Sequence, residues 1–252
     1  MNIKKHIPNA ITSGNLVCGC FAIVSAMHNN LVLTAYFVGI ALILDYFDGF
    51  VARLLKVGGE LGKQLDSLAD VVTFGVVPGM VIFQMIRYPH VIWVGNVVPE
   101  TAVSTTVYFI SLIAFLIPVF SAMRLAIFNI DTRQTSSFIG VPTPANAMLI
   151  CSLPLIGVYQ PDLFGCNLNN IIYDIYFLVG LTLVMSYLLV AELPLFALKF
   201  KNFKWAENKI RFVFLIISLV LLILFHFIAI PIIIFLYILL SIINNITNKN
   251  EI

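Results

Sequence analysis

Four aspartates with helical spacing lie in two neighbouring apolar stretches of the sequence. Asp45 and Asp48 are three residues apart in the first stretch, and Asp66 and Asp70 are four apart in the second. Residues at these separations share one face of a helix, so each stretch would present two carboxylates along one stripe. A short glycine-containing segment joins the stretches and predicts antiparallel neighbouring helices, on which all four carboxylates converge.

Four close carboxylates repel one another, and divalent cations remove that repulsion. Carboxylate oxygens suit Mg²⁺ or Mn²⁺, and two such ions can clamp a diphosphate and stabilise the leaving phosphate. The spacing therefore predicts a site for two divalent cations, Mg²⁺ or Mn²⁺. A membrane cation transporter is the alternative from another class of protein, because acidic residues in membrane helices also line ion paths.

The composition predicts that these helices lie in a membrane. Of the 252 residues, 61% are hydrophobic and 10% are charged, with a mean hydropathy of +1.03. A soluble domain is typically about 45–50% apolar and about 25% charged. We expect an all-α, polytopic membrane bundle of about eight helices, with six or seven as alternatives, after a short basic interfacial segment at residues 2–13. The expected spans lie near residues 14–27, 32–55, 64–86, 103–127, 144–160, 171–191, 211–226 and 228–243.

The basic residues predict the orientation of the bundle. Lys and Arg are concentrated on the cytoplasmic side of membrane proteins. With the N-terminus inside, only Arg87 of the fourteen falls on the opposite side. We expect an inner-membrane protein with both termini and the active site in the cytoplasm. We divide the chain into a membrane domain, 1–195, and a basic cytoplasmic loop with a C-terminal helical hairpin, 196–252. The thirteen basic residues on the inner side are Lys4, Lys5, Arg53, Lys56, Lys63, Arg124, Arg133, Lys199, Lys201, Lys204, Lys209, Arg211 and Lys249.

The two acidic stretches together resemble the signature of the CDP-alcohol phosphatidyltransferase family. This resemblance implies a membrane helical bundle whose site opens at the cytoplasmic side. It also implies that the four aspartates hold two metal ions and that Asp70 accepts a proton. The pattern D-x2-D-G-x2-A-R-x8-G-x3-D-x3-D is matched by Asp45, Asp48, Gly49, Ala52, Arg53, Gly62, Asp66 and Asp70.

The same resemblance implies which residues bind a CDP-activated lipid. Gly49 and Arg53 are expected to touch this donor, and small side chains at Ala52 and Gly62 would let a flat base approach the backbone. Small residues also let membrane helices pack closely, which is an equal alternative for each glycine taken alone.

Three further segments are similar to bacterial-type phosphatidylserine synthases, a branch of the family. They are residues 7–12 with Asn15, residues 124–129, and residues 138–146. Ile127 replaces a basic residue that is usual in this branch. The likeness spans roughly residues 5–150. It implies transfer of a phosphatidyl group from CDP-diacylglycerol to L-serine, which gives phosphatidylserine and CMP, and it adds Asn9 and Thr12 to the expected donor site.

The expected serine site contains Arg124 and Asn129. A buried guanidinium suits a carboxylate through two parallel hydrogen bonds, although Arg124 fits an ordinary cytoplasmic anchor equally well. Glycerol 3-phosphate or inositol as acceptor, and an archaeal-type lipid as donor, are the alternatives within the family. We expect the substrates and the lipid bilayer as partners and no nucleic acid, and a homodimer is left open.

Overall fold

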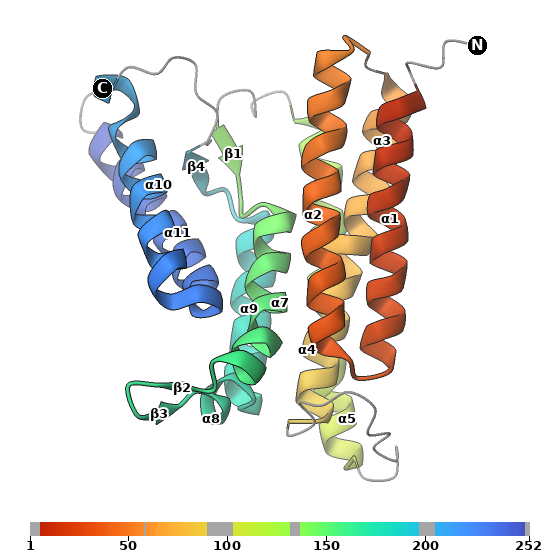
Figure 1. Cartoon of the computed structure of the whole chain (residues 1–252), viewed down its shortest axis with the longest axis vertical. Coiled ribbons are helices and arrows are strands. Elements are labelled where there is room, and N and C mark those ends of the chain that lie inside the picture. The colour runs from red at the N-terminus through yellow and green to blue at the C-terminus, as the bar shows by residue number, and fades with distance from the viewer. Residues whose placement is uncertain (1–5, 58, 90–102, 132–136, 197–204, 250–252) are drawn as a thin grey trace.

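The structure is a computed structural model that describes residues 6–57, 59–89, 103–131, 137–196 and 205–249. Long apolar helices dominate these residues (Figure 1), and the expected all-α membrane bundle is confirmed. Helices satisfy their own backbone hydrogen bonds, which is what a lipid environment requires. The helical segments that are long and apolar enough to cross a membrane are His6–Met27, Leu31–Leu54, Glu60–Arg87, Thr105–Ile130 and Asn208–Thr247.

The first two helices, α1 (His6–Met27) and α2 (Leu31–Leu54), form a hairpin. Asn30 ends the connecting turn, and its side chain accepts a hydrogen bond from the Leu33 amide at 3.1 Å. Helix α1 begins before residue 14, so the described part of the expected interfacial segment is already helical. Pro8 is tolerated there because the first amides of a helix have no partner within the helix.

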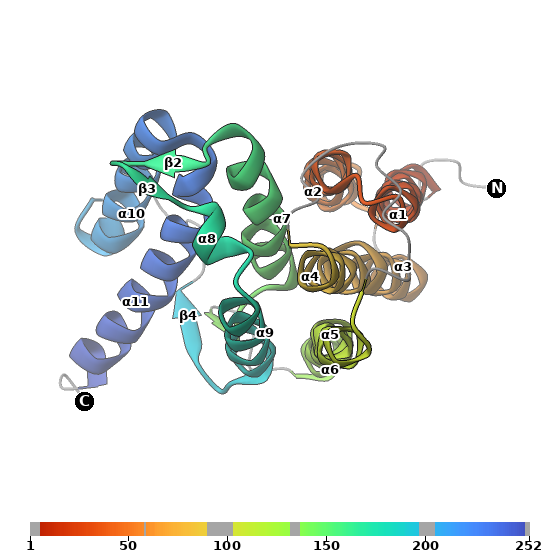
Figure 2. The same cartoon turned by 90° about the horizontal axis from the view of Figure 1, so that it is seen from below.

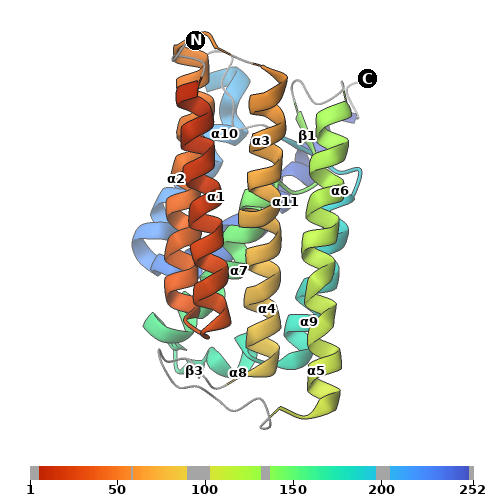
Figure 3. The same cartoon turned by 90° about the vertical axis from the view of Figure 1, so that its right-hand side faces the viewer.

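The third rod consists of α3 (Glu60–Asp70), the π-helical segment η2 (Val71–Val76) and α4 (Val77–Arg87) (Figure 3). A π-helical turn often marks a functional site, and this one directly follows Asp70. Helix α1 approaches η2 so closely that a Cβ atom on Gly19 would collide with Thr73. The Thr73 hydroxyl also donates to the Asn15 carbonyl oxygen at 3.3 Å.

The fourth rod consists of α5 (Thr105–Ser111), the 3₁₀ segment η4 (Leu112–Phe115) and α6 (Leu116–Ile130). Glycines bring it close to the third rod. A Cβ atom on Gly79 would lie 2.9 Å from the Pro118 side chain, and one on Gly75 would lie 3.1 Å from that of Ser121. Small residues allow such close approach between membrane helices, so α6 is held against the rod that carries Asp66 and Asp70.

Two shorter apolar helices follow, α7 (Thr143–Tyr159) and α9 (Ile175–Val190). Strands β2 (Asp162–Leu163) and β3 (Cys166–Asn167) and the short helix α8 (Asn169–Ile172) lie between them. Strand β1 (Ser137–Ile139), before α7, pairs antiparallel with β4 (Pro194–Phe196), after α9. Strands β2 and β3 also pair antiparallel with each other. Neither of these two small ladders was expected from the sequence.

The C-terminal hairpin consists of α10 (Trp205–Phe225), the 3₁₀ turn η5 (His226–Ile228) and α11 (Ala229–Lys249). His226 adopts a φ of 46°, and the chain reverses there. With α10 and α11 taken separately, the described residues contain six long apolar segments and the two shorter helices α7 and α9, which together make the expected number of eight. Helix α7 lies between this hairpin and the helices α2 and α4 (Figure 2).

Gln160, just after α7, fixes the turn of this hairpin. Its Nε2 donates to the Phe225 carbonyl oxygen at 3.0 Å, and its Oε1 accepts from the amides of Phe227 and Ile228 at 2.8 and 3.2 Å. One side chain therefore satisfies backbone groups that the reversal leaves outside the helical ladder.

The two ends of the bundle differ. The start of α1, the junction of α2 with α3, and the ends of α6 and α11 lie at one end, which we call the site end (Figures 1 and 3). The short strands β2 and β3, helix α8 and the start of α5 lie at the opposite end, which we call the far end. The first and last described helices therefore start and finish at the same end of the bundle.

Candidate functional site

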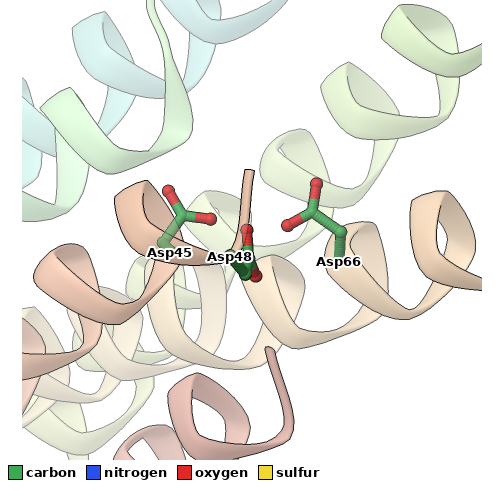
Figure 4. A group of neighbouring side chains, drawn as sticks. All are labelled: Asp45, Asp48 and Asp66. Atoms are coloured by element: carbon green, nitrogen blue, oxygen red, sulfur yellow. The ribbon is translucent and has the colours of Figure 1, made fainter. Parts of the chain in front are cut away.

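Three of the predicted carboxylates meet near the site end. Asp45 and Asp48 project from α2 and Asp66 from α3, and one carboxylate oxygen of each lies within 4.8 Å of the others (Figure 4). Asp48 is buried and the other two are half-buried. The set offers only anionic oxygens, which are the ligands that Mg²⁺ and Mn²⁺ prefer, so these side chains fit a divalent cation.

Asp70 extends this cluster by one turn of α3. It lies within hydrogen-bonding reach of Asp45 and is buried, with 7% of its surface exposed. Asn15 on α1 donates to Asp70 Oδ1 at 3.4 Å. The structure thus brings together all four predicted aspartates, three in mutual contact distance and the fourth beside Asp45.

Helix α1 supplies a hydroxyl that orients the cluster. Thr12 Oγ1 lies 2.6 Å from Asp48 Oδ2 and 3.1 Å from the Pro8 carbonyl oxygen. A hydroxyl has one proton to donate, and the shorter distance directs it to the carboxylate. Hydrogen bonds to charged groups are the stronger kind, so Thr12 fixes the position of the Asp48 side chain.

A pocket of about 500 Å³ opens beside the carboxylates, between α1, α2 and α3. Pockets for small molecules typically measure about 300–1,000 Å³. Its lining includes five of the six residues predicted to bind the CDP-lipid, together with two of the carboxylates. These lining residues are Asn9, Thr12, Asp48, Gly49, Ala52, Gly62 and Asp66.

Glycines keep this pocket open. A Cβ atom on Gly62 would lie 3.1 Å from Asn9 Oδ1, and one on Gly49 would lie 3.5 Å from Arg53 Nη1. Arg53, the sixth predicted residue, is therefore next to Gly49, and its side chain is exposed. It lies beside the pocket rather than in its lining.

Arg124 on α6 is a buried cation, with 7% of its surface exposed. Its guanidinium lies 5.8 Å from the centroid of the Phe128 ring, and its Nε has no hydrogen-bond partner among the described residues. Helix α6 packs against η2, the segment that directly follows Asp70. Buried charges are usually paired and hydrogen-bonded, so this guanidinium is suited to an incoming anion.

Asn129 does not share the surroundings of Arg124. Its side-chain Nδ2 donates to Ser67 Oγ at 2.8 Å, and its backbone carbonyl oxygen accepts from Lys63 Nζ at 2.8 Å. In this arrangement Asn129 joins α6 to α3, and Lys63 also lines the pocket.

Sequence reasoning assigned no role to two buried polar residues. Asn15 and Asn146 were each noted only as part of a similar segment. Asn146 on α7 is fully buried, and neither amide atom has a partner among the described residues. Buried polar atoms are rarely left without a partner. In the sequence, Asn146 was only a polar residue within an apolar stretch, and that pattern alone does not indicate a functional site.

Comparison with known proteins agrees with this geometry. Residues 5–161 match the family model for CDP-alcohol phosphatidyltransferase. A CDP-diacylglycerol–serine O-phosphatidyltransferase from Bacillus subtilis is 32% identical over 207 residues, which cover 81% of this chain and 96% of the relative. One with the same name from Helicobacter pylori strain 26695 is 32% identical over 215 residues, covering 84% and 80%. An archaetidylserine synthase from Methanothermobacter thermautotrophicus is 29% identical over 171 residues, covering 64% of each chain.

Proposed function

We propose a reaction for this chain from the premise that it belongs to the CDP-alcohol phosphatidyltransferase family. It transfers the phosphatidyl group of CDP-diacylglycerol to L-serine and releases CMP. The observation that carries this proposal is the buried guanidinium of Arg124, whose Nε has no hydrogen-bond partner among the described residues. Arg124 lies on α6, which packs against η2, the segment that directly follows Asp70. Family membership also removes the basis for the alternative of a cation transporter.

The aspartates hold two divalent cations, Mg²⁺ or Mn²⁺, in this proposal. Asp45, Asp48 and Asp66 supply the clustered oxygens, Asp70 stands beside Asp45, and Thr12 fixes Asp48. Such ions, when bound, neutralise a diphosphate and stabilise the charge on a departing phosphate.

The pocket binds the CDP head of the donor lipid. The absence of side chains at Gly49 and Gly62, and the small one at Ala52, leave room for the cytidine to approach the backbone. Asn9 lies next to Gly62 and offers an amide to the nucleotide, and Arg53 contacts the donor from beside Gly49. The acyl chains extend into the surrounding lipid.

Asp70 accepts the proton of the serine hydroxyl. The serine oxygen bonds to the phosphorus that carries diacylglycerol, and the bond between that phosphorus and the CMP oxygen breaks. Asn15, which donates to Asp70 Oδ1, orients the accepting carboxylate. Positioning and electrostatic stabilisation supply most of the acceleration in transfers of this kind.

Arg124 binds the carboxylate of serine. The names of the bacterial relatives and of the archaeal relative all include serine, whereas the lipid differs between them. Arg124 is a single buried cation and matches one carboxylate, whereas the dianionic phosphate of glycerol 3-phosphate calls for more positive charge. Asn129 supports this site through its link between α6 and α3.

A panel of acceptors tests the reaction. Purified protein in detergent would receive CDP-diacylglycerol with L-serine, glycerol 3-phosphate or inositol, and CMP release and the lipid product would be measured. Phosphatidylserine as the dominant product supports the proposal. If phosphatidylglycerophosphate or phosphatidylinositol formed instead, the acceptor would be glycerol 3-phosphate or inositol, and the proposed transferase chemistry would still hold. CMP release with no acceptor preference would refute serine recognition.

The site end faces the cytoplasm of an inner membrane in this proposal, and so do both termini. Arg53, Lys56 and Lys63 lie at the site end. The predicted cytoplasmic residues Lys4, Lys5, Arg133, Lys199, Lys201 and Lys204 lie outside the described residues.

The native cysteine of the far end provides a test of this orientation. Cys166 in β3 is exposed, whereas Lys56 is exposed near the site end. With Cys18, Cys20 and Cys151 replaced by serine, an impermeant maleimide added to spheroplasts should label Cys166. It should not label a second variant that carries both Cys166→Ser and Lys56→Cys, and the reverse pattern would invert the topology.

A further inference from the structure

Two contacts hold α6 against the rod that α3, η2 and α4 form. In one of them, a Cβ atom on Gly75 would lie 3.1 Å from the Ser121 side chain. In the other, which is closer to the site end, Asn129 Nδ2 donates to Ser67 Oγ at 2.8 Å. Helix α6 and the rod run in opposite directions (Figure 3), so the later residue on α6 meets the earlier residue on the rod.

Arg124 and Asp70 both lie between these two contacts. Arg124 is between Ser121 and Asn129 on α6, and Asp70 is between residues 67 and 75 on the rod. Ser121 and Arg124 are both buried, and residues three apart share one face of a helix. Ser121 meets Gly75, so this face of α6 is turned toward η2. The two contacts therefore determine where Arg124 lies relative to Asp70.

We propose that Ser67 is a positioning residue for the acceptor. Through Asn129 it holds the end of α6 on the helix that carries Asp66 and Asp70, and so fixes Arg124 relative to these carboxylates. This inference rests on the proposed function, in which Arg124 binds the carboxylate of serine. Ser67 thus connects the helix of the clustered aspartates to the helix that binds the acceptor.

Packing through glycines does not fix this part of α6 by itself. The side chains that meet Gly75 and Gly79 are those of Ser121 and Pro118, and both precede Arg124 on α6. A helix that is held only there can still tilt or turn beyond the point of contact. The hydrogen bond nearer the site end adds a fixed point on the other side of Arg124.

Lys63 holds the end of α6 a second time. Its Nζ donates to the backbone carbonyl oxygen of Asn129 at 2.8 Å. This carbonyl is one of the last four of α6, which have no partner within the helix. A cation near the C-terminus of a helix also interacts favourably with the helix dipole. Lys63 and Ser67 are four residues apart on α3, so one face of α3 binds both the side chain and the backbone of Asn129.

The variant Ser67→Ala removes the hydroxyl that accepts from Asn129 and retains all four aspartates. The matched control is Ser111→Ala, because the Ser111 hydroxyl donates within its own helix, to the Tyr108 carbonyl oxygen. We expect Ser67→Ala to raise the serine KM roughly two- to tenfold, the range for loss of one hydrogen bond. The KM for CDP-diacylglycerol, the Mg²⁺ concentration for half-maximal activity and the thermal stability in detergent should change little. Ser67→Thr keeps the hydroxyl and should recover most of the loss, and Ser111→Ala should leave the serine KM unchanged.

A double-mutant cycle tests whether Ser67 acts through Asn129. In an Asn129→Ala background, Ser67→Ala should have no further effect on the serine KM, because coupled residues are not additive. An unchanged serine KM in Ser67→Ala, equal effects in both backgrounds, or a joint rise of the serine KM and the Mg²⁺ requirement would each overturn the inference. A wild-type protein that does not use serine would instead overturn the proposed function on which the inference rests.

Discussion

The proposed donor side and the proposed acceptor side of the site are built in different ways. The donor side takes its carboxylates and small residues from α2 and α3, neighbours in the sequence, with Asn9 and Thr12 from α1. The acceptor side takes Arg124 from α6, which η2, α4, α5 and η4 separate from α3 in the sequence. In this proposal the donor chemistry depends on a compact motif, whereas recognition of the acceptor depends on how distant helices pack.

The largest effect should follow from removing one clustered carboxylate. Asp45→Asn keeps the size of the side chain and removes its charge, so we expect activity to fall by roughly a thousandfold or more, as losing several kcal/mol of charge stabilisation implies. Asp174→Asn is the control, because Asp174 caps α9 at the far end by accepting from the Phe177 amide. Steady-state CMP release measures both variants. Near-normal turnover by Asp45→Asn would exclude this residue from the donor chemistry.

The next largest effect should separate the two sides. Arg124→Ala should raise the serine KM strongly, because losing one partner of a desolvated charge pair typically costs about 2–5 kcal/mol, or roughly thirty- to several-thousand-fold. The KM for CDP-diacylglycerol should hardly change, since the donor is held between α1, α2 and α3. Arg124→Lys retains the charge and should recover part of the loss. An equal rise of the KM values for serine and CDP-diacylglycerol would contradict separate acceptor and donor sides.

A bulky residue in the pocket should give the opposite pattern. Gly49→Leu should raise the KM for CDP-diacylglycerol by about tenfold or more, as overpacking typically costs about 1–3 kcal/mol, and leave the serine KM nearly unchanged. Gly39→Leu is the control on the same helix, since a Cβ atom there meets nothing within 4 Å. If Gly49→Leu and Gly39→Leu had the same KM for CDP-diacylglycerol, Gly49 would have only a packing role.

The smallest effect should come from the hydroxyl that orients Asp48. Thr12→Val removes the hydrogen bond to that carboxylate and should lower kcat/KM by roughly tenfold, within the range for hydrogen bonds to charged groups. Thr12→Ser keeps the hydroxyl and should remain close to wild type. The ratio of these two variants, measured at fixed metal concentration, isolates the hydrogen bond from the change in packing. If Thr12→Ser were as impaired as Thr12→Val, the Thr12 hydroxyl would not orient Asp48.

The sequence predicted the clustering of the aspartates because fixed spacing on two neighbouring helices determines which side chains meet. Asp45, Asp48 and Asp66 converge as their separations require, and Gly49 and Gly62 line the expected pocket. The helical membrane bundle was predicted from the long apolar stretches of the sequence. The start of α1 at His6 was missed because the polar residues of its first turns suggested an interface, whereas several of them line the site.

The acceptor side could be predicted only in part. Arg124 was identified through its similar segment, but its burial depends on how tightly α6 packs against η2 and α4, where Gly75 and Gly79 allow close approach. The π-helical segment after Asp70 has no simple sequence pattern. Contacts between distant elements are set by tertiary packing, which periodicity does not encode.

One measurement tests the central claim most directly. Purified wild-type protein would be given CDP-diacylglycerol and labelled L-serine, first with excess EDTA and then with Mg²⁺ or Mn²⁺ restored, while phosphatidylserine and CMP are counted. The account predicts equal amounts of the two products, no turnover in EDTA, and recovery when the ion returns. Full turnover in excess EDTA, or CMP formed without phosphatidylserine, would contradict it.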